Sequence, residues 1–267
     1  PALLPERDAD KSPVLECIDL GITFGGLKAV DNFNVTIGRT EITGLIGPNG
    51  AGKTTVFNLL TKVYQPTHGT ILLNGKDIHG LNTAQVNRAG IARTFQNIRL
   101  FGELSVEENI TVAMDTQMHY TMPEGILRLP RFWQEERVVH ERAMELLSIF
   151  HMEDLAGAKA SSLPYGAQRR LEILRALATN PSLLLLDEPA AGMNPSETAE
   201  LMENIRSIRD TFKIAVLLIE HDMNLVMNIC EGIAVLNFGR VIAKGTPEDI
   251  QNNPEVIEAY LGKQKEA

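Results

Sequence analysis

The sequence lacks any long hydrophobic run. No apolar stretch approaches the ~18–20 residues that a helix needs to cross a bilayer. The two best candidates, Ser182–Leu186 and Ile214–Ile219, have the length of interior strands and are closed by Asp187 and Glu220. The stretch Pro1–Lys11 is polar and of mixed charge, unlike the hydrophobic region of a secretion signal. We therefore expect a cytosolic protein that acts on a membrane only from outside the bilayer.

Cysteine and positive charge are also scarce. The only two cysteines, Cys17 and Cys230, show neither CxxC nor Cys/His spacing. This argues against a zinc site or a disulfide and favours two small buried residues in a reducing compartment. The 267 residues include 34 acidic and 25 basic side chains, a net charge of −9. That balance argues against the broad basic face of a nucleic-acid-binding protein.

A glycine-rich loop is present in full. The pattern of Gly, four residues, then Gly, Lys and Ser or Thr is met, with one further Thr, by Gly47, Pro48, Asn49, Gly50, Ala51, Gly52, Lys53, Thr54 and Thr55. The apolar run Glu41–Ile46 precedes it as a strand should, and the helix-compatible run Thr54–Thr61 follows it. This is the context that a phosphate-binding loop requires. It disfavours the alternative, a glycine-rich turn before a helix that happens to begin with lysine.

The chemistry of this loop suits a triphosphate. Glycines let backbone N–H groups curl around a phosphate, and the following helix aims its positive end at the same anion. Lys53 can then reach the β- and γ-phosphates, while the Thr54 hydroxyl can ligate Mg²⁺. The sequence therefore predicts that the chain binds a nucleoside triphosphate.

Two acids follow a strand of leucines. Asp187 and Glu188 come directly after Leu183–Leu186 and precede Pro189. In α/β proteins the carboxyl ends of the strands form the edge where ligands bind. We expect Asp187 to hold Mg²⁺ directly or through water, and Glu188 to orient or deprotonate the attacking water. The alternative, a strand end capped by solvated acids, is disfavoured by the phosphate-binding loop in the same chain.

Two single polar residues extend this set. Gln96 follows the expected strand Ile91–Phe95, where an amide could contact Mg²⁺ or the attacking water. His221 follows the expected strand Ile214–Ile219, where it could donate to a γ-phosphate. Taken alone, Gln96 is more simply an exposed loop residue, and His221 is more simply a structural histidine. Both assignments therefore depend on the residues around them.

Alternating strands and helices predict an α/β fold. Apolar residues make up 44% and charged residues 22%, as in an ordinary globular chain. Buried apolar strands that alternate with helices imply a largely parallel sheet. Strands are expected at Val14–Phe24, Asn34–Ile37, Glu41–Ile46, Thr70–Leu73, Ile91–Phe95, Ser182–Leu186, Ile214–Ile219, Ile233–Leu236 and Arg240–Ala243. Helices are expected at Thr54–Thr61, Thr83–Ala89, Ala167–Thr179, Ser196–Arg209 and Asp222–Cys230.

The middle of the chain has a different character. Residues 97–165 lack strong strand patterns, and Ser105–Glu108 forms a capping-box pattern that opens a helix. Gln134–Phe150 has apolar residues at helical spacing. We expect a helical subdomain over 97–165 inserted into a core of residues 1–96 and 166–267. The segment Met114–Trp133 is expected to be irregular, as a packed surface excursion or as a partner contact.

In chain order these features resemble the ATP-binding subunit of an ABC transporter. The resemblance covers nearly the whole chain. It implies an α/β P-loop NTPase core with a mainly parallel sheet, an N-terminal antiparallel β-subdomain and an inserted helical subdomain. In that family two subunits face each other and enclose two molecules of ATP with Mg²⁺. The resemblance assigns Phe24 to stacking on adenine, Gln96 to the Q-loop, Glu188 to the catalytic base and His221 to the switch histidine.

The signature motif of that family is altered here. The consensus Leu-Ser-Gly-Gly-Gln corresponds to residues 163–167, where Pro164 replaces the serine whose hydroxyl contacts the γ-phosphate of the partner's ATP. The N–H groups of Gly166 and Ala167, with the helix dipole, can still bind an anion. We therefore expect a non-identical ATPase partner, with a homodimer as the alternative, and a weaker nucleotide site at this signature. The D-loop also carries Asn194 where the family commonly has Asp.

One branch of the family is most similar to this chain. The segments 93–101, 165–173, 219–223 and 245–262 resemble the ATP-binding subunit of branched-chain amino acid importers. This implies a hydrolase at the inner face of the membrane that powers uptake through permease subunits, with an extracytoplasmic binding protein as an indirect partner and no nucleic acid. Arg99, Leu100 and Phe101 are candidate coupling residues. Alternatives are the lipopolysaccharide exporter's ATPase, a soluble ABC ATPase and a non-hydrolysing nucleotide switch.

Overall fold

The computed structural model describes residues 13–114 and 130–261. These residues form two compact units. One extends from Asn97 to Pro181, and the other combines the chain up to Gln96 with the chain from Ser182 onward. The predicted boundary at residue 165 between the helical subdomain and the core stays a prediction. Among the described residues, no helix has both the length and the apolar character needed to cross a membrane.

The larger unit, which holds the phosphate-binding loop, is built on two sheets. The antiparallel sheet has the order β2-β1-β4-β5 and the six-stranded sheet the order β10-β9-β3-β8-β7-β6. In the latter, β6, β7, β8, β3 and β9 pair in parallel and only β10 is antiparallel. The strands are β1 (Pro13–Phe24), β2 (Leu27–Gly38), β3 (Ile42–Ile46), β4 (His68–Leu73), β5 (Lys76–Asp77), β6 (Ile91–Arg93), β7 (Leu183–Asp187), β8 (Ala215–Ile219), β9 (Gly232–Asn237) and β10 (Arg240–Gly245). The predicted α/β class with a mainly parallel sheet and an antiparallel β-subdomain is confirmed.

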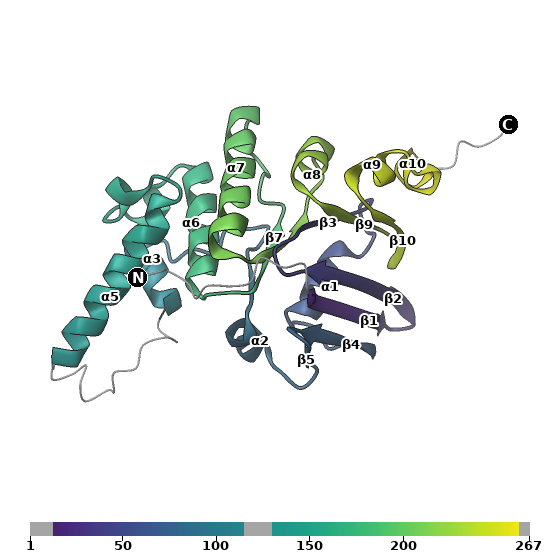
Figure 1. Ribbon diagram of the computed structural model, residues 1–267, viewed down its shortest axis with the longest axis horizontal. Coiled ribbons are helices and arrows are strands. Elements are labelled where there is room, and N and C mark those ends of the chain that lie inside the picture. The colour runs from purple at the N-terminus through teal and green to yellow at the C-terminus, as the bar shows by residue number, and fades with distance from the viewer. Residues whose placement is uncertain (1–12, 115–129, 262–267) are drawn as a thin grey trace. The chain divides into compact units, whose positions relative to one another are not determined.

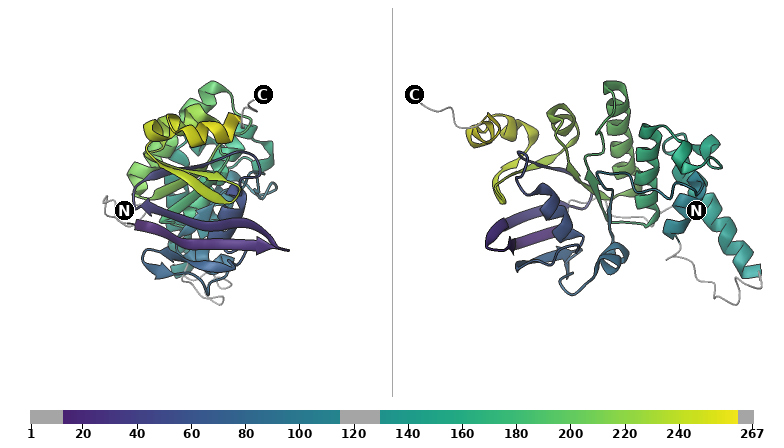
Figure 2. Two further views of the ribbon diagram at one scale, coloured as in Figure 1. Left: turned by 90° about the vertical axis from the view of Figure 1, so that its right-hand side faces the viewer. Right: turned by 180° about the vertical axis from the view of Figure 1, so that it is seen from behind.

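Helices cover both faces of the parallel sheet. In Figures 1 and 2, α7 and α8 lie on one face, whereas α1 and the antiparallel sheet lie on the other. Every residue of β7 and β8 is buried, as expected for apolar strands covered on both sides. Alternate side chains of these strands, such as Leu185 and Leu217, join those of α1 in one hydrophobic core. The helices of this unit are α1 (Lys53–Leu60), α2 (Thr83–Ala89), α7 (Pro195–Phe212), α8 (Met223–Ile229), α9 (Pro247–Gln251) and α10 (Pro254–Leu261).

The smaller unit is helical. It comprises α3 (Val106–Met114), α5 (Pro130–Ser148) and α6 (Tyr165–Ala178), with the short 3₁₀ helices Glu153–Leu155 and Ala160–Ser162 between the last two. The predicted capping box forms: Ser105 N–H donates to Glu108 Oε2 at 2.7 Å and Glu108 N–H donates to Ser105 Oγ at 3.1 Å. The inserted helical subdomain predicted from the sequence is thus helical as expected.

The largest differences from the expected element boundaries are at β2 and α5. β2 begins at Leu27, not Asn34, because its polar first half pairs with β1 across the Gly25-Gly26 turn. α5 begins at Pro130, so residues 130–133 are helical although Met114–Trp133 was expected to be irregular. Proline suits the first turn of a helix because its missing N–H would have no partner there. Residues 115–129 of that segment lie outside the described part of the chain.

Both cysteines are buried and unpaired, as predicted. Burial, the dominant cause, raises the pKa of each thiol to about 12. They therefore behave as apolar side chains of the core.

Candidate nucleotide site

The phosphate-binding loop is held in place by close backbone contacts. It joins β3 to α1, and a Cβ on Gly47 (φ +153°) would lie 2.0 Å from the Leu236 carbonyl oxygen. Gly52 (φ +104°) is comparably confined by the Ala29 carbonyl oxygen. The Gly239 N–H, in the turn between β9 and β10, donates to the Ala51 carbonyl at 2.8 Å. Glycine is therefore required at both positions, and the loop is fixed to the strands around it.

Lys53 folds over its own loop. Its Nζ donates to the carbonyls of Gly47 at 2.6 Å and Pro48 at 3.0 Å, and the residue is only 7% exposed. Burial lowers the pKa of Lys53, whereas the charges of Glu188 and Asp187 oppose that shift. A lysine so placed presents its positive charge where the loop amides converge.

A cavity of about 250 Å³ lies over the loop. Its lining residues come from the loop, from the first turn of α1 and from the ends of two parallel strands: Asn49, Gly50, Ala51, Gly52, Lys53, Thr54, Thr55, Glu188 and His221. The structure thus brings Glu188 and His221, which are 33 residues apart, to the phosphate-binding loop. Phe24, Gln96 and Asp187 do not line this cavity.

Asp187 is buried at the end of β7 and paired with a cation. Its Oδ2 accepts from Arg93 Nη2 at 2.7 Å, and its N–H donates to Thr94 Oγ1 at 3.3 Å. The Arg93 guanidinium also donates to Asn58 Oδ1 of α1 at 2.7 Å. A buried carboxylate paired in this way is held in one orientation.

Glu188 forms the centre of a three-residue cluster. Its Oε2 accepts from Gln96 Nε2 at 3.0 Å, and its Oε1 lies 2.7 Å from His221 Nε2. The backbone of Glu188 is left-handed (φ 49°), which non-glycine residues seldom adopt, and its N–H donates to the Ile219 carbonyl at 2.9 Å. Gln96 and His221, predicted separately from the sequence, therefore each lie within hydrogen-bonding distance of Glu188.

Comparison with known proteins decides the family. The profile of the family described as ABC transporter matches residues 30–191, and that of the branched-chain amino acid ATP-binding cassette transporter matches residues 240–266. The chain belongs to the ABC transporter family. It is an ATP-binding subunit and an ATPase of that family.

Individual relatives agree with this. The high-affinity branched-chain amino acid transport ATP-binding protein LivG of Escherichia coli K12 is 50% identical over 94% of this chain and 98% of its own length. The lipopolysaccharide export system ATP-binding protein LptB of Haemophilus influenzae is 32% identical over 94% of this chain and 98% of its own length. A crystal structure of the ADP conformation of MJ1267, an ATP-binding cassette of an ABC transporter, superposes with a TM-score of 0.81 at 29% identity, covering 94% of this chain and 99% of that one.

The residues expected to contact adenine and a partner's phosphate lie elsewhere in this ABC ATPase. Phe24 ends β1, is 43% exposed and meets the ring of Tyr64 edge-on at 5.2 Å. Gly166 and Ala167 lie in the first turn of α6, in the helical unit. There Pro164 is the N-cap residue and provides no side-chain hydrogen bond. Gly166 and Ala167 are thus presented by a helix whose first turn has no side-chain cap.

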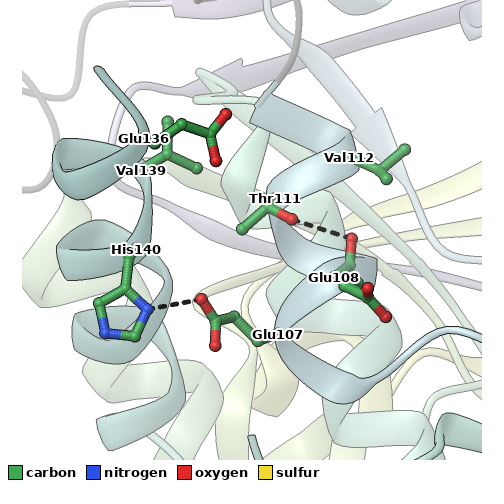
Figure 3. A pocket seen from close by; sticks show the side chains of 7 residues that line it. All are labelled: Glu107, Glu108, Thr111, Val112, Glu136, Val139 and His140. Carbon is green, nitrogen blue, oxygen red and sulfur yellow. Dashed lines mark hydrogen bonds and ion pairs between the residues drawn. The ribbon is translucent and has the colours of Figure 1, made fainter. Parts of the chain in front are cut away.

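A second cavity, of about 510 Å³, lies between α3 and α5 of the helical unit. His140 Nδ1 of α5 and Glu107 Oε1 of α3 point toward one another across it at 2.6 Å (Figure 3). Its other lining residues are Glu108, Thr111, Val112, Glu136 and Val139, none of them a predicted site residue. Within the described ranges, no group of three His, Cys, Asp or Glu side chains could hold a metal ion, here or elsewhere.

Sequence reasoning missed two residues that contact the predicted site residues. Arg93 lies in the expected strand Ile91–Phe95, where an arginine beside an acid-bearing strand was the available signal. Glu220 was taken only as the end of an apolar run, although it directly precedes His221. The side chains of both are largely covered, and both touch residues that the motifs had identified.

Proposed function

We propose that this chain powers the uptake of branched-chain or related hydrophobic amino acids by an ABC importer. The observation that carries the proposal is the 50% identity to LivG over nearly the full length of both chains. The match of residues 240–266 to the branched-chain profile supports it from a separate part of the chain. The lower identity to LptB, 32%, makes lipopolysaccharide export the second choice.

Several groups fit Mg²⁺ as the companion of ATP. Thr54, Gln96 and Asp187 offer a hydroxyl, an amide and a carboxylate oxygen, the kinds of ligand that this hard cation takes. Mg²⁺ needs few protein ligands because it binds phosphates and water as well. When bound, the metal ion neutralises charge on the β- and γ-phosphates.

The chain's own residues supply the rest of the proposed reaction. The loop amides and Lys53 hold the triphosphate, and Phe24 stacks on the adenine ring. Glu188 orients a water and takes its proton as the water oxygen attacks the γ-phosphorus and the bond to the ADP oxygen breaks. His221 and Gln96 hold the two carboxylate oxygens of Glu188.

Transport requires partners that this chain does not contain. We propose two ATPase subunits that close on ATP and reopen after hydrolysis, in contact with permease subunits at the inner face of the membrane. The second ATPase is a different chain, since Pro164 weakens the signature. An extracytoplasmic binding protein delivers the amino acid to the permeases. Hydrolysis rather than a passive switch follows from the intact set of Lys53, Asp187 and Glu188.

The substitution Glu188→Gln tests the catalytic part of this proposal. Its amide cannot accept a proton, so we expect kcat to fall by about 10²–10⁴-fold, with ATP affinity retained and a stable ATP-bound dimer. Steady-state turnover and binding of a fluorescent ATP analogue measure the two effects. Turnover at the wild-type level would refute the role of Glu188.

A transport assay tests the cargo. The chain is reconstituted in proteoliposomes with candidate permease subunits and a candidate second ATPase, and uptake of labelled leucine is measured. We expect ATP-dependent uptake that excess isoleucine or valine inhibits and that Lys53→Ala abolishes. ATP-dependent release of lipopolysaccharide instead, without amino acid uptake, would establish the second choice.

A further inference from the structure

Glu220 is a buried carboxylate between two loops of the nucleotide site. It follows β8 directly and is 5% exposed. Within the described residues, its two oxygens are satisfied by backbone amides. Burial, the largest effect, raises the pKa of this carboxyl, and hydrogen bonds from the amides of Ala190, His221 and Asp222 oppose that rise. A buried acid is costly unless its hydrogen bonds are made, so its place needs an explanation.

Its hydrogen bonds join two separate segments. Oε1 accepts from the Ala190 N–H at 2.8 Å, and Oε2 accepts from the His221 N–H at 3.1 Å. Ala190 lies two residues after Glu188, in the turn that leads to α7, whereas His221 begins the turn that leads to α8. One carboxylate therefore connects the segment that carries Glu188 with the segment that carries His221.

These two segments meet again at the site itself. The side chains of Glu188 and His221 are 2.7 Å apart, and the Glu188 N–H donates to the Ile219 carbonyl, one residue before Glu220. Glu188 also has a left-handed backbone, which surrounding contacts must hold because it is strained. The Ala190 and His221 amides bond different oxygens of the Glu220 side chain, and a glutamine in its place would keep only one of the two as an acceptor.

We propose that Glu220 is a positioning residue that sets the geometry of the Glu188–His221 pair by holding the backbone of both segments. This rests on the proposed roles of Glu188 and His221. Glu220 does not touch the cavity over the phosphate-binding loop. Its effect therefore falls on the chemical step and not on capture of the nucleotide.

The test is the substitution Glu220→Gln in the full chain. The amide keeps the size of the side chain but offers one accepting oxygen and places an NH₂ against a second N–H, so one segment is released. A displacement of about 1 Å in a catalytic group costs on the order of 10²-fold in rate, so we expect kcat to fall by between ~10 and ~100-fold. The KM for ATP and the binding of a fluorescent ATP analogue stay within about twofold. An unchanged kcat, or an increase in KM that matches the loss of kcat, overturns the proposal.

Two comparisons separate positioning from general damage. Glu203→Gln makes the same chemical change on the exposed face of α7 and is expected to leave kcat unaltered. In the His221→Ala background, Glu220→Gln is expected to lower kcat by a smaller factor than it does in the wild type, because part of its effect acts through His221. Multiplicative losses overturn the proposal. Wild-type turnover by Glu188→Gln would instead refute the proposed function, whatever the Glu220 variant does.

Hydrogen exchange tests the same contacts without a substitution. In the wild-type chain the Ala190 and His221 amides are expected to be protected and to exchange at similar rates, since one carboxylate bonds both. Exchange of either amide at the rate of a free peptide overturns the proposal, even if the Glu220→Gln variant does not fold.

Discussion

Each charged group of the nucleotide site has a partner of its own. Lys53 donates to two loop carbonyls, Asp187 accepts from Arg93, and Glu188 contacts Gln96 and His221. Binding of ATP therefore exchanges existing hydrogen bonds for new ones, and the net gain in free energy is the difference between them. We therefore expect each hydrogen bond that these side chains lose when the nucleotide binds to be replaced by one to the ligand.

Arg93 shows how a single residue can connect several parts of the site. Its guanidinium lies 5.3 Å from the Phe57 ring centroid and 5.0 Å from that of Phe95, besides its bonds to Asn58 and Asp187. Phe57 and Asn58 belong to α1, whereas Phe95 precedes Gln96. Arg93 thus touches the helix of the phosphate-binding loop, the acid on β7 and the residue before Gln96.

The thiols provide a prediction with a defined pH dependence. Because burial raises the pKa of Cys17 and Cys230 to about 12, the reactive thiolate is scarce at pH 8. We expect iodoacetamide to leave both thiols unlabelled in the folded chain at pH 8 and to label both in denaturant. The labelling rate should rise with pH well above pH 8. Mass spectrometry counts the labels, and rapid labelling of the folded chain at pH 8 would contradict the assignment.

At the scale of elements, the start of α3 depends on one side chain. Ser105 caps this helix through its bond to the Glu108 N–H. Ser105→Ala removes that acceptor, so we expect the free energy of unfolding to fall by about 0.5–2 kcal/mol. Urea denaturation measures it.

Two further variants control for the change of residue type. Ser207→Ala, on the exposed face of α7, is expected to be neutral or slightly stabilising, because alanine is the better helix former. Ser105→Asp should retain most of the stability, since aspartate also caps helices well. Equal stability of Ser105→Ala and the wild type would show that the cap contributes nothing measurable.

Local sequence patterns predicted most helices and strands. The parts that were missed are stabilised by residues far away in the sequence. The apolar strands β7 and β8 were placed within a residue because burial on both faces leaves a continuous apolar run. The first half of β2 was missed because Lys28, Asp31 and Asn32 interrupt its pattern. Asp31 is instead bound by Arg240, 209 residues later, whose Nη2 lies 2.6 Å away.

The same reasoning applies to the site. The loop Gly47–Thr55 and the acids at Asp187 and Glu188 are contiguous motifs, so the sequence predicted them directly. Arg93 and Glu220 act on residues 94 and 30 positions away, and no local spacing indicates such pairs. Only the parallel sheet, which places the ends of β6, β7 and β8 side by side, brings them together.

At the scale of the whole molecule, Pro164 bears on the ATP affinity of the site that a pair of ATPase subunits would form at this signature. If the signature of this chain completes a partner's site, the missing hydroxyl removes one charged hydrogen bond, worth roughly 1.5–3 kcal/mol. We expect Pro164→Ser to raise the ATP affinity of that site by about tenfold or more. Nucleotide titration of the assembled ATPase pair measures this.

The wild-type chain without a partner provides a second test of the weakened signature. Purified alone, it is expected to show weak ATPase activity that does not depend cooperatively on ATP. Full, cooperative activity of the chain by itself would contradict both the weakened signature and the need for a different partner.

The turn between β9 and β10 links the phosphate-binding loop to the C-terminal region of the chain. Its Gly239 bonds the Ala51 carbonyl in the phosphate-binding loop, and the branched-chain profile begins at the very next residue, Arg240. The region that matches the branched-chain profile therefore begins directly after a turn that is hydrogen-bonded to the phosphate-binding loop. Replacing residues 240–266 with the corresponding residues of a related ABC ATPase is therefore expected to change ATP binding and hydrolysis as well as the features specific to the branched-chain branch.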